Sequence, residues 1–137
     1  RADGAKVVAG GRRVRSETGG FFIEPTVFDS VANNMRIAQE EIFGPVLAVI
    51  TVRDFDEAMT VANDTIYGLA AGVWTGSVKN AHRAAKTIKA GVVWVNCFDR
   101  GLFSVPFGGF KQSGFCRYKS LHAMDKYSDL KAIWFAH

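Results

Sequence analysis

Two adjacent carboxylates, Glu40 and Glu41, lie in the segment 39–46, which has the sequence QEEIFGPV. An ionised carboxylate can only accept hydrogen bonds, so each of them suits a ligand with donor groups or a basic side chain. Phe43 follows, and Gly-Pro then leads the chain into an apolar run. The segment is a candidate binding site, although a turn that enters a strand would explain the Gly-Pro pair equally well.

A second candidate begins where another apolar run ends in Asn96 and Cys97 and continues into PFGGFKQSG at residues 106–114. A lone cysteine at a strand end invites interpretation as a nucleophile. However, the sequence places no histidine or other base beside Cys97 to deprotonate it. The sequence has no HExxH, CxxC, GxSxG or GxGxxG motif, and its two cysteines lack the spacing of metal ligands.

Composition excludes several classes of protein. The 137 residues are 48% hydrophobic and 22% charged, as in a globular domain able to form a core of its own. No apolar run approaches the roughly 20 residues of a membrane span, so we expect no membrane partner. The net charge of +4 comes from 17 basic and 13 acidic residues mixed along the chain, which indicates solvated faces rather than a nucleic-acid partner. Two cysteines without a disulfide framework favour the cytoplasm.

The elements that must position both candidates alternate between strand and helix. We predict strands at 46–52, 69–75 and 91–96, each an apolar run. Helices should begin after the N-caps Asp54 and Ser77, and the second should bury Val78, Ala81, Ala85 and Ile88. This pattern predicts an α/β fold, layered, with a mainly parallel sheet and helical crossovers.

The two ends follow other patterns. An initial strand at 6–9 starts almost at once after Arg1, which suggests that an upstream part is missing. Residues 21–28 resemble a strand bent at Pro25. Glycines and Pro106 predict a loop at 101–114, followed by a short helix at 120–127 and a last strand at 129–135.

The ordered segments IEPTVF, EEIFGPV, YGLAAGVWT, GVVWVN and PFGGFKQSG closely resemble the NAD(P)-dependent aldehyde dehydrogenase superfamily. The resemblance runs from about residue 8 to residue 134. It implies the C-terminal half of the catalytic domain at 1–128 and a terminal oligomerisation strand at 129–137, which would make the parent protein a homo-oligomer. The tail KSLHAMDKYSDLKAIW is most similar to the γ-glutamyl-γ-aminobutyraldehyde dehydrogenase type.

The resemblance also implies roles for single residues. The parent enzyme would oxidise an aldehyde to a carboxylic acid with NAD or NADP, through a thioester on a cysteine. Glu41 would accept hydrogen bonds from the nicotinamide-ribose hydroxyls, and Phe43 would pack beside them. Asn96, Phe98 and Phe107 would line the passage for the aldehyde.

The catalytic cysteine and glutamate of the resembling family lie upstream of these segments. We therefore expect none of the residues here to be catalytic, Cys97 included, and we expect the chain alone to be inactive. An alternative is a non-catalytic oligomerisation or binding module that retains the fold. The substrate is left open, because Leu102 and Phe103 replace the polar or acidic residues that would suit an amino-aldehyde. Cys116 and Tyr118 also depart from the Gly and acidic residue usual there.

Overall fold

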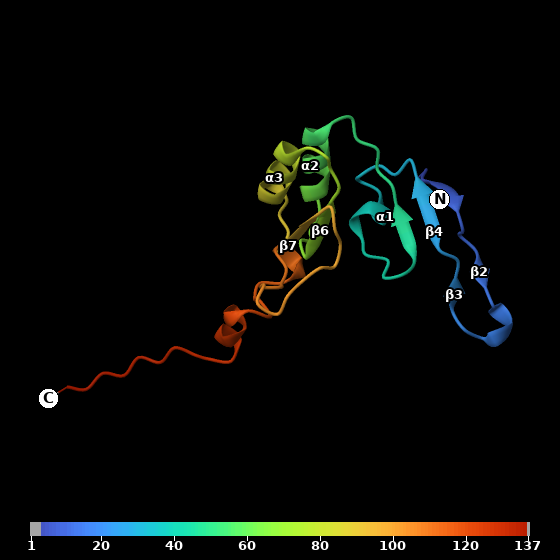
Figure 1. The fold of residues 1–137 in the computed structure, drawn as a ribbon. Helices are drawn as coiled ribbons and strands as arrows, with labels where there is room; N and C mark the ends of the chain where they lie inside the picture. Colours follow the sequence, from blue (N-terminus) through green and yellow to red (C-terminus); the bar gives the residue numbers. More distant parts are fainter. Residues whose placement is uncertain (1–3, 137) are drawn as a thin grey trace. The chain divides into compact units, whose positions relative to one another are not determined.

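A computed structural model describes residues 4–136 of the chain. The chain divides into two compact units, Arg1–Asp64 and Thr65–His137. Each unit is an α/β assembly, which confirms the predicted class (Figure 1). This division follows compactness, and it does not test the functional boundary that we expected at residue 128.

The first unit contains a three-stranded sheet in the order β1–β4–β5. Strand β1 (Lys6–Ala9) runs antiparallel to β4 (Thr26–Asp29), and β4 runs parallel to β5 (Val46–Ala48). The predicted strand 46–52 is therefore too long by four residues. Val49 still donates to the Phe28 carbonyl at 2.9 Å and accepts from the Val31 amide at 3.2 Å, and the pairing with β4 does not continue beyond it.

A small hairpin extends from this sheet. Strands β2 (Arg13–Val14) and β3 (Phe22–Ile23) pair antiparallel around the 3-10 turn Ser16–Thr18. The guanidinium of Arg12 meets the carboxylate of Glu24 at the base of the hairpin, 3.0 Å away. The chain then bends at Pro25 before β4 begins, as predicted from the sequence.

Two helices complete the first unit. The short α1 (Arg36–Gln39) precedes the acidic pair, and α2 (Phe55–Asn63) follows β5. Asp54 caps α2 as predicted, because its carboxylate accepts a hydrogen bond from the Glu57 amide at 2.9 Å. The side-chain amide of Gln39, the last residue of α1, donates to the carbonyl of Asp64, which follows α2, 3.0 Å away. This hydrogen bond joins the C-terminal ends of the two helices.

The second unit is built on one parallel strand pair. Strand β6 (Ala70–Val73) lies beside β7 (Val92–Val95), and the crossover helix α3 (Val78–Thr87) packs against β7 (Figure 1). Ser77 caps α3 as predicted. These strands form a sheet of their own, whereas β5 belongs to the sheet with β4. Each of these two sheets contains a parallel pair, in agreement with the predicted α/β fold.

The buried face of α3 differs from the predicted one. Ala84 is fully buried and Ile88 nearly so, whereas Ala85 is exposed and Val78 is 72% exposed. The prediction is confirmed for Ile88, and Ala81 is half-buried. It is wrong for Val78 and for Ala85, whose place on the buried face is taken by the neighbouring Ala84.

The remainder of the second unit has little regular structure. The loop after β7 contains the 3-10 turn Lys111–Ser113, and the expected short helix is a 3-10 helix, Leu121–Lys126. Residues 128–136 form no strand within the described chain. A strand at a chain end needs a partner to form a ladder, so a terminal strand is absent here, and pairing with another chain stays a prediction.

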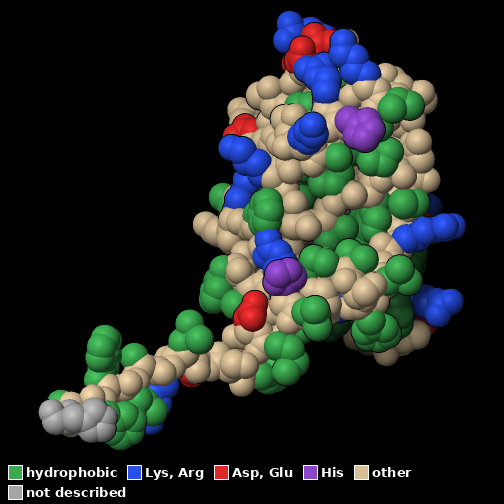
Figure 2. Space-filling view, turned by 60° about the vertical axis from the view of Figure 1, so that its left-hand side comes forward, with side chains coloured by type: hydrophobic (Ala, Val, Ile, Leu, Met, Phe, Trp, Pro, Cys, Tyr) green, Lys and Arg blue, Asp and Glu red, His purple; other side chains and the backbone are tan. Residues whose placement is uncertain are grey.

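The core of the described residues is small. Four apolar residues are buried, namely Ala5, Val31, Ala84 and Ile88. Large side chains such as those of Phe43 and Trp134 are each 93% exposed, and hydrophobic side chains are plain along the terminal segment in Figure 2. The chain is long enough to form a core of its own, but within the described residues it buries few large side chains. No helix in the part that the structure describes is long and apolar enough to cross a membrane.

Candidate functional site

The two adjacent carboxylates of the first unit have different surroundings. Glu40 follows the last turn of α1 and receives two hydrogen bonds from the Arg36 guanidinium, at 2.8 and 3.0 Å. These hydrogen bonds hold the pKa of Glu40 below its ordinary value. Glu41 is exposed and has no hydrogen-bond or ion-pair partner among residues 4–136. Only Glu41 therefore has its acceptor capacity free for a ligand.

Phe43 is held in an unusual backbone conformation beside Glu41. Its φ of 54° lies in the left-handed region, which costs a bulky residue about 1–2 kcal/mol. The ring is 93% exposed. The chain is fixed just after it, since the Thr26 amide donates to the Pro45 carbonyl at 2.8 Å where β5 meets β4. The strand junction thus keeps an aromatic ring at the surface, next to an unpaired carboxylate.

A cavity of about 260 Å³ brings these residues together. Glu41, Phe43 and Gly44 line it with Ile37 of α1 and Ala48 of β5. The same segment borders a wider hollow of about 510 Å³ that reaches Phe28 of β4. The two predicted cofactor residues therefore share one concave surface of the first unit.

Asn96 ends β7 and serves mainly to join it to β6. Its side-chain oxygen accepts from the Thr75 amide at 2.9 Å, and its side-chain nitrogen donates to the Thr75 carbonyl at 3.0 Å. Its backbone has a φ of 53°, a left-handed conformation that asparagine tolerates better than most residues. Asn96 is thus a clamp between two strand ends, whereas we had expected it to line a passage.

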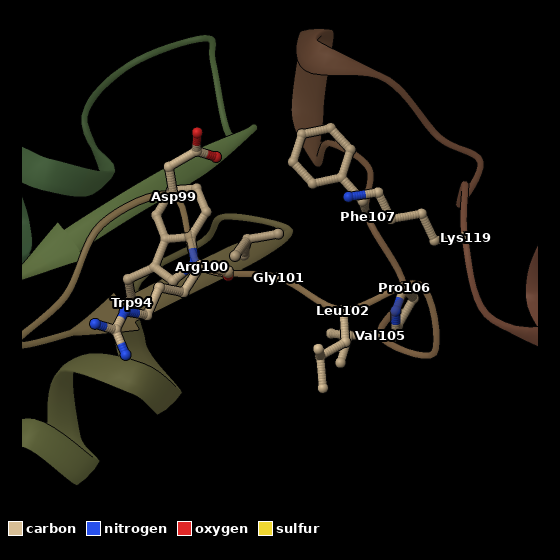
Figure 3. Close-up of a pocket in the computed structure, with 10 residues that line it drawn as sticks. Trp94, Asp99, Arg100, Gly101, Leu102, Val105, Pro106, Phe107 and Lys119 are labelled. Atoms are coloured by element: carbon tan, nitrogen blue, oxygen red, sulfur yellow. The ribbon is translucent and has the colours of Figure 1, made fainter.

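The other two predicted lining residues of the second unit lie in different places. Phe107 lines a cavity of about 110 Å³ with Trp94 and Lys119, as Figure 3 shows. Phe98 is 67% exposed and packs its ring against Trp94, with ring centres 5.1 Å apart. Asn96 and Phe98 are not among the residues that border this cavity.

Two residues of this cavity were missed from the sequence. The indole N–H of Trp94 donates to the Arg100 carbonyl at 2.6 Å and so fixes the start of the loop. The ammonium of Lys119 lies 5.5 Å from the centre of the Phe107 ring. The tryptophan could have been suspected from its position two residues before Asn96, whereas nothing in the sequence marks Lys119.

Neither cysteine shows the surroundings of a catalytic group. Cys97 is half-buried, Cys116 is exposed, and both are free thiols. Across residues 4–136 no three histidine, cysteine, aspartate or glutamate side chains gather in a way that could hold a metal ion. Among the described residues, neither cysteine thiol has a hydrogen bond or ion pair with a base.

Comparison with known proteins places these two loops in one family. The Aldehyde dehydrogenase family matches residues 1–133. The aminoacetaldehyde dehydrogenase of Pseudomonas aeruginosa is 54% identical over 84% of this chain, which corresponds to 23% of that protein. The betaine aldehyde dehydrogenase of Mesorhizobium japonicum is 48% identical over 98% of the chain and 28% of its own length. The chain thus spans about a quarter of the length of these curated relatives.

Solved structures agree with the sequence relatives. The aldehyde dehydrogenase KauB from Pseudomonas aeruginosa superposes with a TM-score of 0.91 at 61% identity, over 98% of this chain and 27% of its own. An indole-3-acetaldehyde dehydrogenase complexed with NAD+ gives the same TM-score at 59% identity, with the same coverage. A γ-glutamyl-γ-aminobutyraldehyde dehydrogenase from Burkholderia cenocepacia gives 0.87 at 57% identity, over 93% of this chain and 26% of its own. This chain belongs to the aldehyde dehydrogenase family.

Proposed function

We propose that this chain supplies the nicotinamide-side and aldehyde-side loops of an NAD(P)-dependent aldehyde dehydrogenase. The net reaction converts an aldehyde, NAD(P)+ and water into a carboxylate, NAD(P)H and two protons. The cofactor supplies the acceptor for the hydride that leaves the aldehyde carbon. The residues of this chain bind and orient, and the nucleophile and base belong to the part of the parent enzyme outside this chain.

The contrast between Glu40 and Glu41 is the observation that carries the proposal. Arg36 occupies the acceptor oxygens of Glu40, whereas those of Glu41 stay open at a cavity. Two adjacent hydroxyls on a ribose match a carboxylate, which accepts two hydrogen bonds and donates none. The exposed ring of Phe43 offers an apolar surface beside them for a flat heterocycle.

The residues therefore fit the nicotinamide half of the cofactor. That half is common to NAD and NADP, so Glu41 would serve either of them. Similar structures have been solved with NAD+, including the indole-3-acetaldehyde dehydrogenase described above. On the aldehyde side, we propose Phe107, which lines the cavity, and Phe98, which packs on Trp94, as walls of the passage. Asn96 would hold the end of β7 from which the loop starts.

The proposal is tested by Glu41→Gln in the enzyme that contains this chain, with Glu40→Gln as a matched control. Glutamine keeps the size of the side chain and removes the charge. A hydrogen bond to a charged group contributes about 1.5–3 kcal/mol, so hydride transfer should slow by roughly ten- to hundredfold. Single-turnover formation of NAD(P)H measures this step directly.

Glu40→Gln should leave hydride transfer within about twofold of the unmodified enzyme, because the residue faces Arg36. Thermal unfolding of both variants checks that each remains folded. If the rate of hydride transfer is unchanged in Glu41→Gln, or falls equally in both variants, Glu41 does not bind the cofactor as proposed.

We further propose that the parent protein assembles as a homo-oligomer through residues 129–137. Leu130, Trp134 and Phe135 are each more than 80% exposed, and the segment has no strand partner in its own chain. Unpaired extended backbone with apolar side chains invites pairing with a second copy. The two free cysteines are typical of a reducing compartment, and we propose the cytoplasm.

A further inference from the structure

The cavity beside Phe107 is small, and part of its lining is apolar. Its uncharged lining comes mainly from Trp94, Leu102, Val105, Pro106 and Phe107 (Figure 3). Its volume of about 110 Å³ approaches that of the roughly 150 Å³ apolar cavities that accept benzene. A short hydrocarbon chain or branched alkyl group therefore matches it in both size and chemistry.

The charged side chains around the same cavity are unfavourable to a cation. Arg100 and Lys119 contribute two positive charges, and Asp99 contributes one negative charge. The lining thus has an excess of one positive charge, which repels an ammonium group brought to the cavity. At the position of Leu102, an acidic side chain would have attracted such a group.

The aromatic rings that could hold a cation already face one from the protein. The Lys119 ammonium lies 5.5 Å from the ring centre of Phe107 and 5.9 Å from that of Phe103. Quaternary ammonium ligands are recognised by ring faces of this kind. A substrate cation would have to displace the lysine from both rings.

An uncharged chain meets neither cost. It carries no charge for Arg100 and Lys119 to repel, and it can lie beside the apolar side chains without displacing the Lys119 ammonium from the two rings.

We propose, on the basis of the aldehyde dehydrogenase function proposed above, that this cavity selects aldehydes with an uncharged apolar chain and discriminates against cationic amino-aldehydes. Lys119 acts as the discriminating residue, because its ammonium occupies the ring faces. This selectivity differs from what the names of the aminoacetaldehyde and betaine aldehyde dehydrogenases indicate for those relatives.

Two aldehydes of matched shape test the proposal in the enzyme that contains this chain. They are 5,5-dimethylhexanal and its cationic isostere 4-trimethylammoniobutanal. The expected kcat/KM for the neutral aldehyde exceeds that for the cationic one by about tenfold or more. An equal or higher kcat/KM for the cationic aldehyde would overturn the proposal and leave the dehydrogenase function standing.

Substitutions of Lys119 test whether its charge causes the selectivity. Lys119→Met should raise kcat/KM for the cationic aldehyde about tenfold and leave the neutral aldehyde within about twofold. Lys119→Arg keeps the positive charge and should retain the discrimination, and Lys79→Met, on the exposed face of α3, should change neither value. An equal change for both aldehydes in Lys119→Met would overturn the role of its charge. Absence of turnover with every aldehyde would overturn the dehydrogenase function itself, and this proposal with it.

Discussion

The two loops differ in how they use their polar groups. In the segment around Glu41, the polar side chain that could bind a ligand is exposed and unpaired, and the backbone of Phe43 is held in a strained conformation beside it. In the loop after β7, the side chains of Asn96 and Trp94 are engaged in holding the loop itself. What that loop offers to a ligand is a small cavity lined by apolar side chains together with Asp99, Arg100 and Lys119.

This difference corresponds to two kinds of recognition. A cofactor presents the same hydroxyls at every turnover, so one free carboxylate at a fixed place is sufficient. A substrate passage distinguishes molecules by shape and charge. In the passage proposed here, Asn96 and Trp94 would hold the loop, and Leu102, Phe107 and Lys119 would contact the aldehyde. Substitutions near Glu41 should therefore act on the cofactor, and substitutions in the loop on stability and on the choice of aldehyde.

The largest expected effect concerns the chain by itself. Neither region brings a nucleophile and a base into contact, so residues 1–137 alone should produce no NAD(P)H from any aldehyde. Absorbance at 340 nm measures this, with the complete parent enzyme as the positive control. Turnover that survives repurification and disappears in Cys97→Ser would show that the loop contains the nucleophile after all.

A second prediction concerns the terminal segment, residues 129–136. The segment lies outside both loops, so its removal should not affect either of them. The chain should form dimers or larger species at micromolar concentration, because residues 129–136 expose apolar side chains on unpaired backbone. Light scattering measures the mass, and a chain ending at Ser128 is the control. A 15 kDa monomer with or without the segment would contradict the proposed assembly.

A smaller effect is expected at Asn96. In Asn96→Ala the two hydrogen bonds to the Thr75 backbone are lost, and alanine must adopt a φ of 53°. Together these changes should destabilise the enzyme by about 1–2 kcal/mol. Asn96→Gly keeps the backbone conformation accessible and should lose only the hydrogen-bond part. Thermal unfolding measures the stability of both variants. If Asn96→Ala is as stable as the unmodified enzyme, Asn96 does not stabilise the two strand ends.

The sequence predicted the elements whose signals are local. The caps Asp54 and Ser77 were identified correctly, because each side-chain oxygen needs only the backbone amide three residues later. The parallel pair β6–β7 followed from two apolar runs with a helix between them. The sequence left open whether each carboxylate of the acidic pair would face a ligand or a basic side chain, and the structure pairs Glu40 with Arg36, four residues earlier.

What could not be predicted depends on partners that are distant in sequence. Strand β5 ends where β4 ends, and the buried face of α3 is Ala84 rather than Ala85 because of where β7 lies. The positive φ of Phe43 runs against the preference of an aromatic residue, so no propensity would have indicated it. Lys119 reaches Phe107 from a turn twelve residues later, a contact that only the folded loop creates.

The central claim is that Glu41 serves the cofactor and the loop after β7 serves the aldehyde. The most direct test measures the apparent affinities for NAD+ and for 5,5-dimethylhexanal in Glu41→Gln and in Phe107→Leu of the enzyme that contains this chain. The account predicts that Glu41→Gln weakens NAD+ about tenfold or more with the aldehyde nearly unchanged, and that Phe107→Leu alters the aldehyde with NAD+ nearly unchanged. A Glu41→Gln variant that binds NAD+ normally but loses affinity for the aldehyde would contradict it.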